Sequence, residues 1–112
     1  MRIKAIAVSA SLLLLAGCGY STPDCSDADT ISLVKEIAYD EIAAHAGREA
    51  ADSLSIEVSA IRTRDHNESA DSYECAANLE ITGDGGTESG PIEYTVESTD
   101  SGDEFYVEVF GL

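Results

Sequence analysis

The sequence predicts an α+β domain in which one N-terminal helix packs on a four-stranded antiparallel meander. Between residues 29 and 46, apolar residues recur at three- and four-residue steps, the period of a helix with one buried face. From Leu54 onward, apolar and polar residues alternate in four stretches separated by polar turns. Strands of this kind are apolar on one face, and the helix is the element that can cover that face.

Residues 1–17 are predicted to be a cleaved signal peptide that precedes this domain. Arg2 and Lys4 give the start two positive charges, residues 5–15 are apolar and free of acids, and Ala16 and Gly17 are small. The apolar run is well short of the roughly 20 residues that span a bilayer. A permanent transmembrane helix is therefore not expected here.

Leu15-Ala16-Gly17-Cys18 resembles the lipobox of bacterial lipoproteins. The resemblance covers the first eighteen residues, and it implies that Cys18 is joined to diacylglycerol and becomes the acylated N-terminus. The lipid bilayer is then a partner through Cys18, since each buried methylene contributes about 0.8 kcal/mol. Because Gly19 and not Asp follows Cys18, the family's sorting rule implies the outer membrane if the host has one. An ordinary signal peptide with a chance cysteine is the alternative.

Two cysteines remain once Cys18 is lipidated. Cys25 and Cys75 lie in a compartment that permits disulfides, and we expect them to pair. Loop-closure entropy for about 50 residues gives an upper figure of roughly 4 kcal/mol. Two free thiols are the alternative.

The charge balance restricts the partners. The chain has a formal net charge of -16, and loss of Arg2 and Lys4 leaves four Lys and Arg against 22 Asp and Glu, near -18. This excess argues against nucleic acid and against lying flat on anionic lipid. It allows basic proteins or divalent cations. Since the acids are spread along the chain, solubility or a salty habitat explains them equally well.

Residues 18–28 are expected to be the lipidated cysteine and a short polar tether, and residues 29–112 a single α+β domain. Asp27 to Thr30 offers N-cap side chains for a helix of about sixteen residues, and Gly47 is a plausible stop. Residues 48–53 favour another helical turn.

The four strands follow from the alternation. Ile61 falls out of step in the first strand, which indicates a bulge or a bend. Cys75 points to the helix-facing side of the second strand, so a bridge to Cys25 would hold the helix start on the sheet. The expected strands start at Leu54, Tyr73, Ile92 and Phe105, with a turn at Asp65 to Asp71, a glycine-rich connection at Gly83 to Gly90 and a last turn at Ser98 to Glu104.

The helix-then-four-strands layout resembles the cystatin-like type of architecture, which hosts unrelated functions. The mature chain also resembles a group of small bacterial lipoproteins without assigned activity, and that resemblance carries over no catalytic residues. Its pieces are Ile61-Arg62-Thr63, Tyr73 to Ala77, Ile92 to Glu97 and Phe105 to Val109.

No catalytic constellation is recognisable, so we expect no enzyme and no cofactor. His45 and His66 have no serine or cysteine partner in a known motif. No metal site is expected, although the acids of two loops leave calcium open as an alternative. Turn chemistry explains these acids equally well. They are Asp84 and Glu88 in one loop, and Asp100, Asp103 and Glu104 in the other.

Tyr106 and Phe110 are the candidate interface residues. Strand parity places them opposite the core positions, on one face with Glu93, Glu97 and Glu108. Exposed aromatics among polar groups can mark an interface. The alternative is that Phe110 wraps into the core and Tyr106 only fills space between strands.

These features favour a lipid-anchored, non-catalytic binding or structural module that engages another protein of the bacterial cell envelope. The alternative is an inhibitor of a basic envelope-targeting enzyme such as lysozyme. Small acidic disulfide-bonded lipoproteins resemble periplasmic lysozyme inhibitors in general character, and charge steering would suit a basic target. An enzyme ranks third, because a domain this small has little room for a deep pocket.

Overall fold

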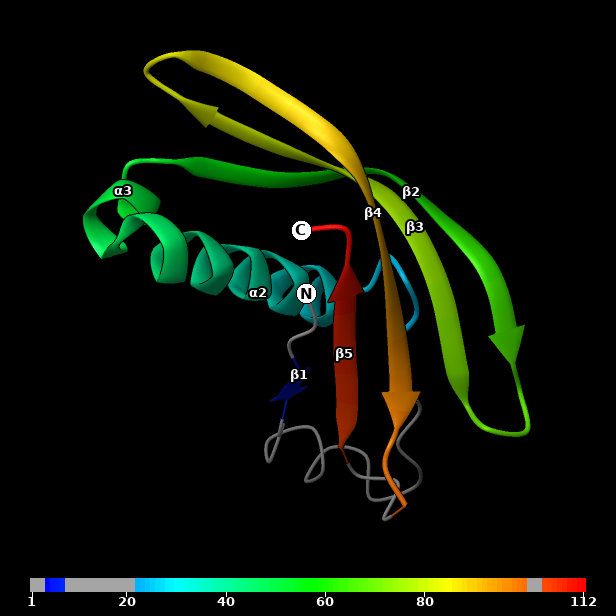
Figure 1. Ribbon diagram of the computed structural model, residues 1–112. Helices are drawn as coiled ribbons and strands as arrows, with labels where there is room; N and C mark the ends of the chain where they lie inside the picture. The colour runs from blue at the N-terminus through cyan, green and yellow to red at the C-terminus, as the bar shows by residue number, and fades with distance from the viewer. Residues whose placement is uncertain (1–3, 8–21, 101–103) are drawn as a thin grey trace.

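The computed structural model describes residues 4–7, 22–100 and 104–112 (Figure 1). One long helix, α2 (Ala28–Ala46), packs on an antiparallel sheet, which confirms the α+β prediction. The four predicted strands form a meander, β2 (Ser55–Asn67), β3 (Ser72–Gly83), β4 (Gly86–Ser98) and β5 (Phe105–Phe110).

A further short strand, β1 (Lys4–Ala7), pairs with β5, so that the sheet order is β1-β5-β4-β3-β2. It lies inside the segment predicted to be the signal peptide, whose cleavage would remove it. The predicted lipobox, including Cys18, lies outside the described residues.

Helix α2 begins directly after its N-cap residue, Asp27. The carboxylate of Asp27 accepts a hydrogen bond from the backbone N–H of Asp29 at 2.9 Å. The helix ends at Gly47, whose φ of 95° is a conformation that suits glycine. A short helix, α3 (Arg48–Asp52), supplies the extra turn that the sequence indicated.

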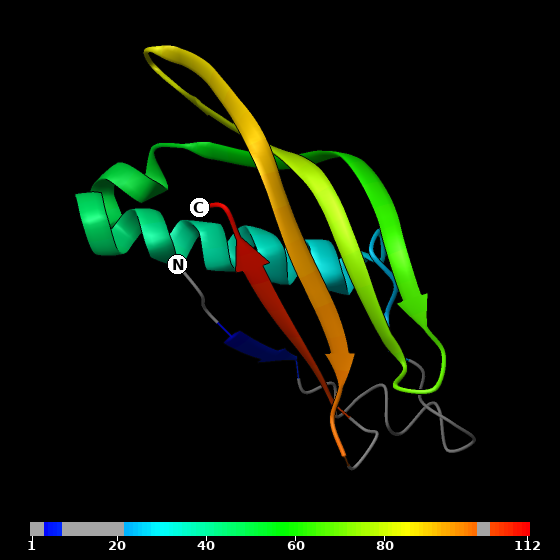
Figure 2. The same ribbon diagram turned by 45° about the vertical axis from the view of Figure 1, so that its right-hand side comes forward.

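The sheet curls around α2, as Figures 1 and 2 show from two directions. Alternate residues of the strands point to the helix, and the core lies between the two layers. Helix α2 contacts β2, β5 and β1. The buried side chains of the core are Cys25, which precedes α2, Leu33, Val34, Ile37 and Ala38 of α2, and Ile56, Cys75, Ala77, Leu79, Ile92, Tyr94, Val96, Phe105, Val107 and Val109 of the sheet.

Strand β2 is irregular where the alternation breaks. The register against β3 shifts between Ser59 and Arg62, and Ala60 has a positive φ of 53°. The predicted break at Ile61 is therefore a bulge. A second shift lies between Thr63 and Asp65.

The turn expected at Asp65 to Asp71 is shorter than predicted. Residues 65–67 remain in the ladder with β3, and the ring of His66 stacks on that of Tyr73 with centroids 4.0 Å apart. Polar composition alone indicated a turn, whereas the pairing with β3 satisfies the backbone groups of these residues.

The glycine-rich connection expected at Gly83 to Gly90 is wrong in extent. Gly83 pairs with Gly86, so that only Asp84 and Gly85 turn between β3 and β4. Glu88 stands in β4 opposite Ile81 and does not share a loop with Asp84. The tight turn keeps both strands paired, and ladder hydrogen bonds outweigh the weak strand preference of glycine.

The predicted disulfide is present. Cys25 and Cys75 are bonded, their Cα atoms lie 5.7 Å apart, and both side chains are buried. The bridge attaches the segment before α2 to β3. Thr22 adds a second attachment, because its backbone N–H and hydroxyl donate to the Asp71 carboxylate at 3.2 and 2.7 Å. The described part of the tether is thus docked on the domain.

Candidate protein-binding surface

The outer face of the sheet carries the two candidate aromatic residues. Phe105, Val107 and Val109 are 0 % exposed on the inner face of β5, and the residues between them point away from α2. Tyr106 is half-buried there, and Phe110 is 37 % exposed. Among the described residues, Phe110 is the one large apolar residue whose side chain is exposed. It does not wrap into the core.

Carboxylates surround these aromatics because of the strand register. Glu93 of β4 stands opposite Phe110, and Glu97 stands opposite Tyr106. Directly opposed residues of an antiparallel pair share a face, so these groups lie together. We define the outer acidic face as Glu74, Glu93, Glu97, Tyr106, Glu108 and Phe110.

One arginine approaches this face from β2. Arg64 Nη1 lies 3.4 Å from Glu93 Oε2, and both side chains are mostly in solvent, 60 % and 63 % exposed. An exposed ion pair of this kind contributes at most about 1 kcal/mol and is screened by salt. Glu93 can therefore exchange Arg64 for a basic group of a partner.

A hollow lies beside Phe110 on this face. It has a volume of about 200 Å³ and is lined by Arg64, Glu74, Glu93, Thr95 and Phe110, among others. An apolar ring next to two carboxylates offers both packing area and charge to a basic side chain. The alternation of the sequence identified the two aromatic residues, but the hollow depends on the register between the four strands β2, β3, β4 and β5.

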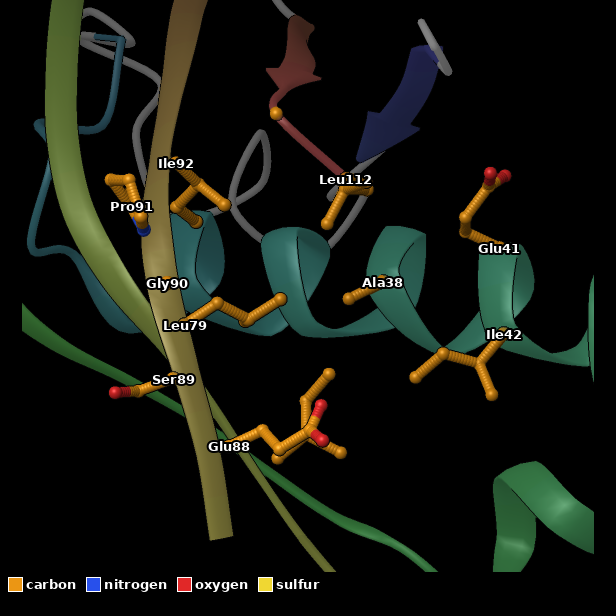
Figure 3. Close-up of a pocket in the computed structure, with 12 residues that line it drawn as sticks. Ala38, Glu41, Ile42, Leu79, Glu88, Ser89, Gly90, Pro91, Ile92 and Leu112 are labelled. Atoms are coloured by element: carbon orange, nitrogen blue, oxygen red, sulfur yellow. The ribbon is translucent and has the colours of Figure 1, made fainter.

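A second, larger groove lies between α2, the β3–β4 hairpin and the C-terminus (Figure 3). Its volume is about 330 Å³. Glu41 stands at its edge and binds His45 Nε2 through Oε2 at 2.9 Å, while its Oε1 is buried without a hydrogen-bond partner. Sequence analysis missed this groove, because its walls come from elements far apart in the chain. The aliphatic walls are Ala38, Ile42, Leu79, Ile81, Pro91, Ile92 and Leu112.

Among the described residues, the ionisable groups with clearly shifted pKa values are tyrosines. Burial, with a smaller effect of Asp24, raises the pKa of Tyr94 to about 12. The hydrogen bond to Asp52 raises the pKa of Tyr39, and burial raises that of Tyr73. A tyrosine hydroxyl with the ordinary pKa of 10.0 is already protonated at neutral pH, and a raised pKa moves it further from the deprotonated form that a general base or a nucleophile needs.

The described residues hold no group of three His, Cys, Asp or Glu side chains arranged for a metal ion. Of the acids considered for calcium in the last loop, Asp103 lies outside the described residues. Within the described ranges, no helix is both long enough and apolar enough to cross a bilayer. Comparison of the chain with protein-family models, curated proteins and solved structures finds no match.

Proposed function

We propose that this protein is a lipid-anchored, non-catalytic module of the bacterial cell envelope that binds another envelope protein through its outer acidic face. Acylated Cys18 would hold it on the bilayer, in the outer membrane if the host has one. The observation that carries the binding role is the exposed ring of Phe110, which lies beside a hollow lined by Glu74 and Glu93.

The partner that fits this face is basic. A Lys or Arg side chain placed in the hollow would meet both carboxylates and pack its methylene groups against Phe110. Aromatic residues with a polar rim are the usual energetic centres of interfaces. The acidic surroundings would also raise the association rate, and this effect weakens as salt is added.

Crosslinking in intact cells, followed by capture of the anchored protein and mass spectrometry, tests the proposal. We expect one dominant envelope protein, with loss of its capture in the Phe110→Ala variant and a decrease in Tyr106→Ala. Tyr39→Phe is the control, because Tyr39 is a half-buried tyrosine on α2, away from the outer acidic face, and this change keeps its packing against the core. Equal capture by all variants, or recovery of abundant bystanders alone, would overturn the proposed role of this face.

An inhibitor of a basic enzyme such as lysozyme is the second candidate, favoured by the combination of Phe110, carboxylates and a hollow on one face. If the protein is such an inhibitor, a micromolar excess of the purified protein should lower lysozyme activity, and the Phe110→Ala variant should inhibit less. Unchanged lysozyme activity removes this candidate and leaves the envelope-protein partner.

A further inference from the structure

The two edges of the predicted four-stranded meander differ in a way that bears on partner binding. The β2 edge contains two register shifts and the left-handed Ala60, features that discourage pairing with another strand. In contrast, all six residues of β5 pair with β4 in one unbroken register. The free side of β5 is thus the regular, pairing-competent edge of the meander.

The full chain shows that this edge accepts an antiparallel strand. Lys4–Ala7 pairs with β5 from Lys4 opposite Glu108 to Ala7 opposite Phe105. Cleavage before Cys18 would remove this strand. The backbone groups of residues 105–108 that face it would then lose their protein partners, and a regular open edge is a template for strand addition.

We propose that the edge of β5 in the processed protein binds an extended basic segment of the partner as an added antiparallel strand, in the register that Lys4–Ala7 holds in the full chain. This inference rests on the proposed function, because it requires removal of residues 1–17. It deepens that function, because the added strand would lie directly beside Tyr106 and Glu108 of the outer acidic face.

The register defines the chemistry of the segment. In the full chain a basic residue stands opposite Glu108, an apolar one, Ile6, opposite Tyr106, and alanines opposite Val107 and Phe105. Directly opposed residues share a face. The basic and apolar residues of the partner would therefore lie on the outer acidic face. Its other residues would face the side of α2, next to fully buried positions, where small side chains fit.

The acidic net charge favours a basic segment of a partner over a second copy of this chain as the strand added to β5. Pairing β5 with β5 would bring two outer acidic faces together, each on a domain of net charge near -18 once residues 1–17 are removed. Like charges placed side by side oppose association, whereas a basic strand is attracted. The groove of Figure 3 lies at the C-terminal end of β5, because Gly111 and Leu112 line it.

The test uses the full-length protein produced in bacteria and extracted from membranes in detergent. Its intact mass first reports whether residues 1–17 have been removed. The probe is a synthetic peptide of residues 1–9, MRIKAIAVS, and hydrogen exchange of the β5 amides is the readout. We expect the peptide to slow exchange at residues 105–108, and a Lys4→Glu peptide to bind more weakly by on the order of tenfold.

A charge swap separates recognition from damage to the fold. The Glu108→Lys variant should lose its preference for the Lys4 peptide and prefer the Lys4→Glu peptide. A scrambled peptide of the same composition is the control for charge alone. Restored protection in the swapped pair would establish the register, which a merely misfolded variant could not reproduce.

The outcomes separate this inference from the proposed function. Processed protein whose β5 amides are unaffected by the peptide overturns strand addition and leaves the outer acidic face in place as the binding surface. Protection that increases with protein concentration and without peptide overturns it in favour of a second copy. A chain that retains residues 1–17 overturns both the anchor and strand addition.

Discussion

Tyr94 joins parts of the molecule that lie far apart in the sequence. Its side chain is 1 % exposed, and its hydroxyl donates a hydrogen bond to the backbone carbonyl of Cys25 at 2.8 Å. In the sheet it stands opposite Cys75, the disulfide partner of Cys25. One tyrosine and one disulfide thus hold the start of α2 on the central strands.

Replacement of Tyr94 by Phe would leave the Cys25 carbonyl without its hydrogen-bond donor in a buried place. We expect the free energy of unfolding at neutral pH to decrease by about 1–3 kcal/mol. Denaturant titration measures it. Tyr73→Phe is the control, because the Tyr73 hydroxyl makes no hydrogen bond with any of the described residues. We expect this substitution to change the free energy of unfolding by no more than about 0.5 kcal/mol. Equal effects of both substitutions would contradict this role of Tyr94.

Ionisation of the Tyr94 hydroxyl should make the free energy of unfolding depend on pH in the alkaline range. Its folded-state pKa of about 12 lies above the ordinary value of 10.0, so the unfolded chain loses this proton first as the pH rises. The contribution of the Tyr94 hydroxyl to the free energy of unfolding should therefore be constant below pH 10 and decrease between pH 10 and about 12. Because Tyr94→Phe lacks this loss, the stability difference between the two proteins should narrow over that range. A constant difference would contradict the prediction.

Strand β2 shows how far an element can be predicted from its own residues. Ile61, which falls out of the apolar–polar alternation, predicted the position of the bulge correctly. An apolar residue out of phase must either face solvent or shift the pairing register of its strand. The left-handed conformation of Ala60 had no such signal, since alanine has no preference for a positive φ. It follows from the pairing of Ser59 and Arg62 with fixed positions on β3.

Ala60→Gly should be neutral or stabilising, although glycine weakens most strands. Release of the left-handed strain contributes about 1–2 kcal/mol, and the greater freedom of glycine in the unfolded chain costs about 0.5–1 kcal/mol. Ala76→Gly, at a buried position in the paired part of β3, is the matched control and should destabilise by about 1 kcal/mol. Equal losses in chemical denaturation would show that Ala60 carries no strain.

At the scale of the whole molecule, charge is the dominant property. The full chain has a net charge of -16, and its 22 acids are spread along the sequence. The cations of the described residues are few, and the ion pairs of Lys35 with Glu57 and of Arg64 with Glu93 are exposed. Repulsion among the carboxylates therefore opposes the compact state more than these pairs offset it.

Salt should stabilise this protein. An increase from about 10 mM to about 500 mM NaCl shortens the Debye length several-fold, and we expect a gain of about 1 kcal/mol in the free energy of unfolding. In a thermal scan this corresponds to an increase of about 4–8 °C in Tm. Sodium chloride is preferred to sulfate, which also strengthens apolar burial. A Tm that decreases with salt would show that attractive pairs outweigh the repulsion.

The sequence by itself determined the order and kind of the main elements. Period-three-and-four spacing up to Ala46 and period-two spacing from Leu54 report which face of each element is buried, and this is a local property. Gly47 marked the helix end, and the parity of β5 placed Tyr106 and Phe110 on the outer face. The buried face of a helix or strand determines the spacing of apolar residues within that element, so these features could be predicted from the local sequence.

Only the tertiary structure decided how the elements pair. It extended β3 and β4 through the glycines to a turn at Asp84 and Gly85, brought Thr22 to Asp71, built the groove beside Leu112, and left β5 regular where β2 is bulged. Each of these features depends on contacts between residues distant in the chain. Local periodicity does not encode such register, because the ladder hydrogen bonds of one strand are satisfied by whichever partner the whole fold brings alongside.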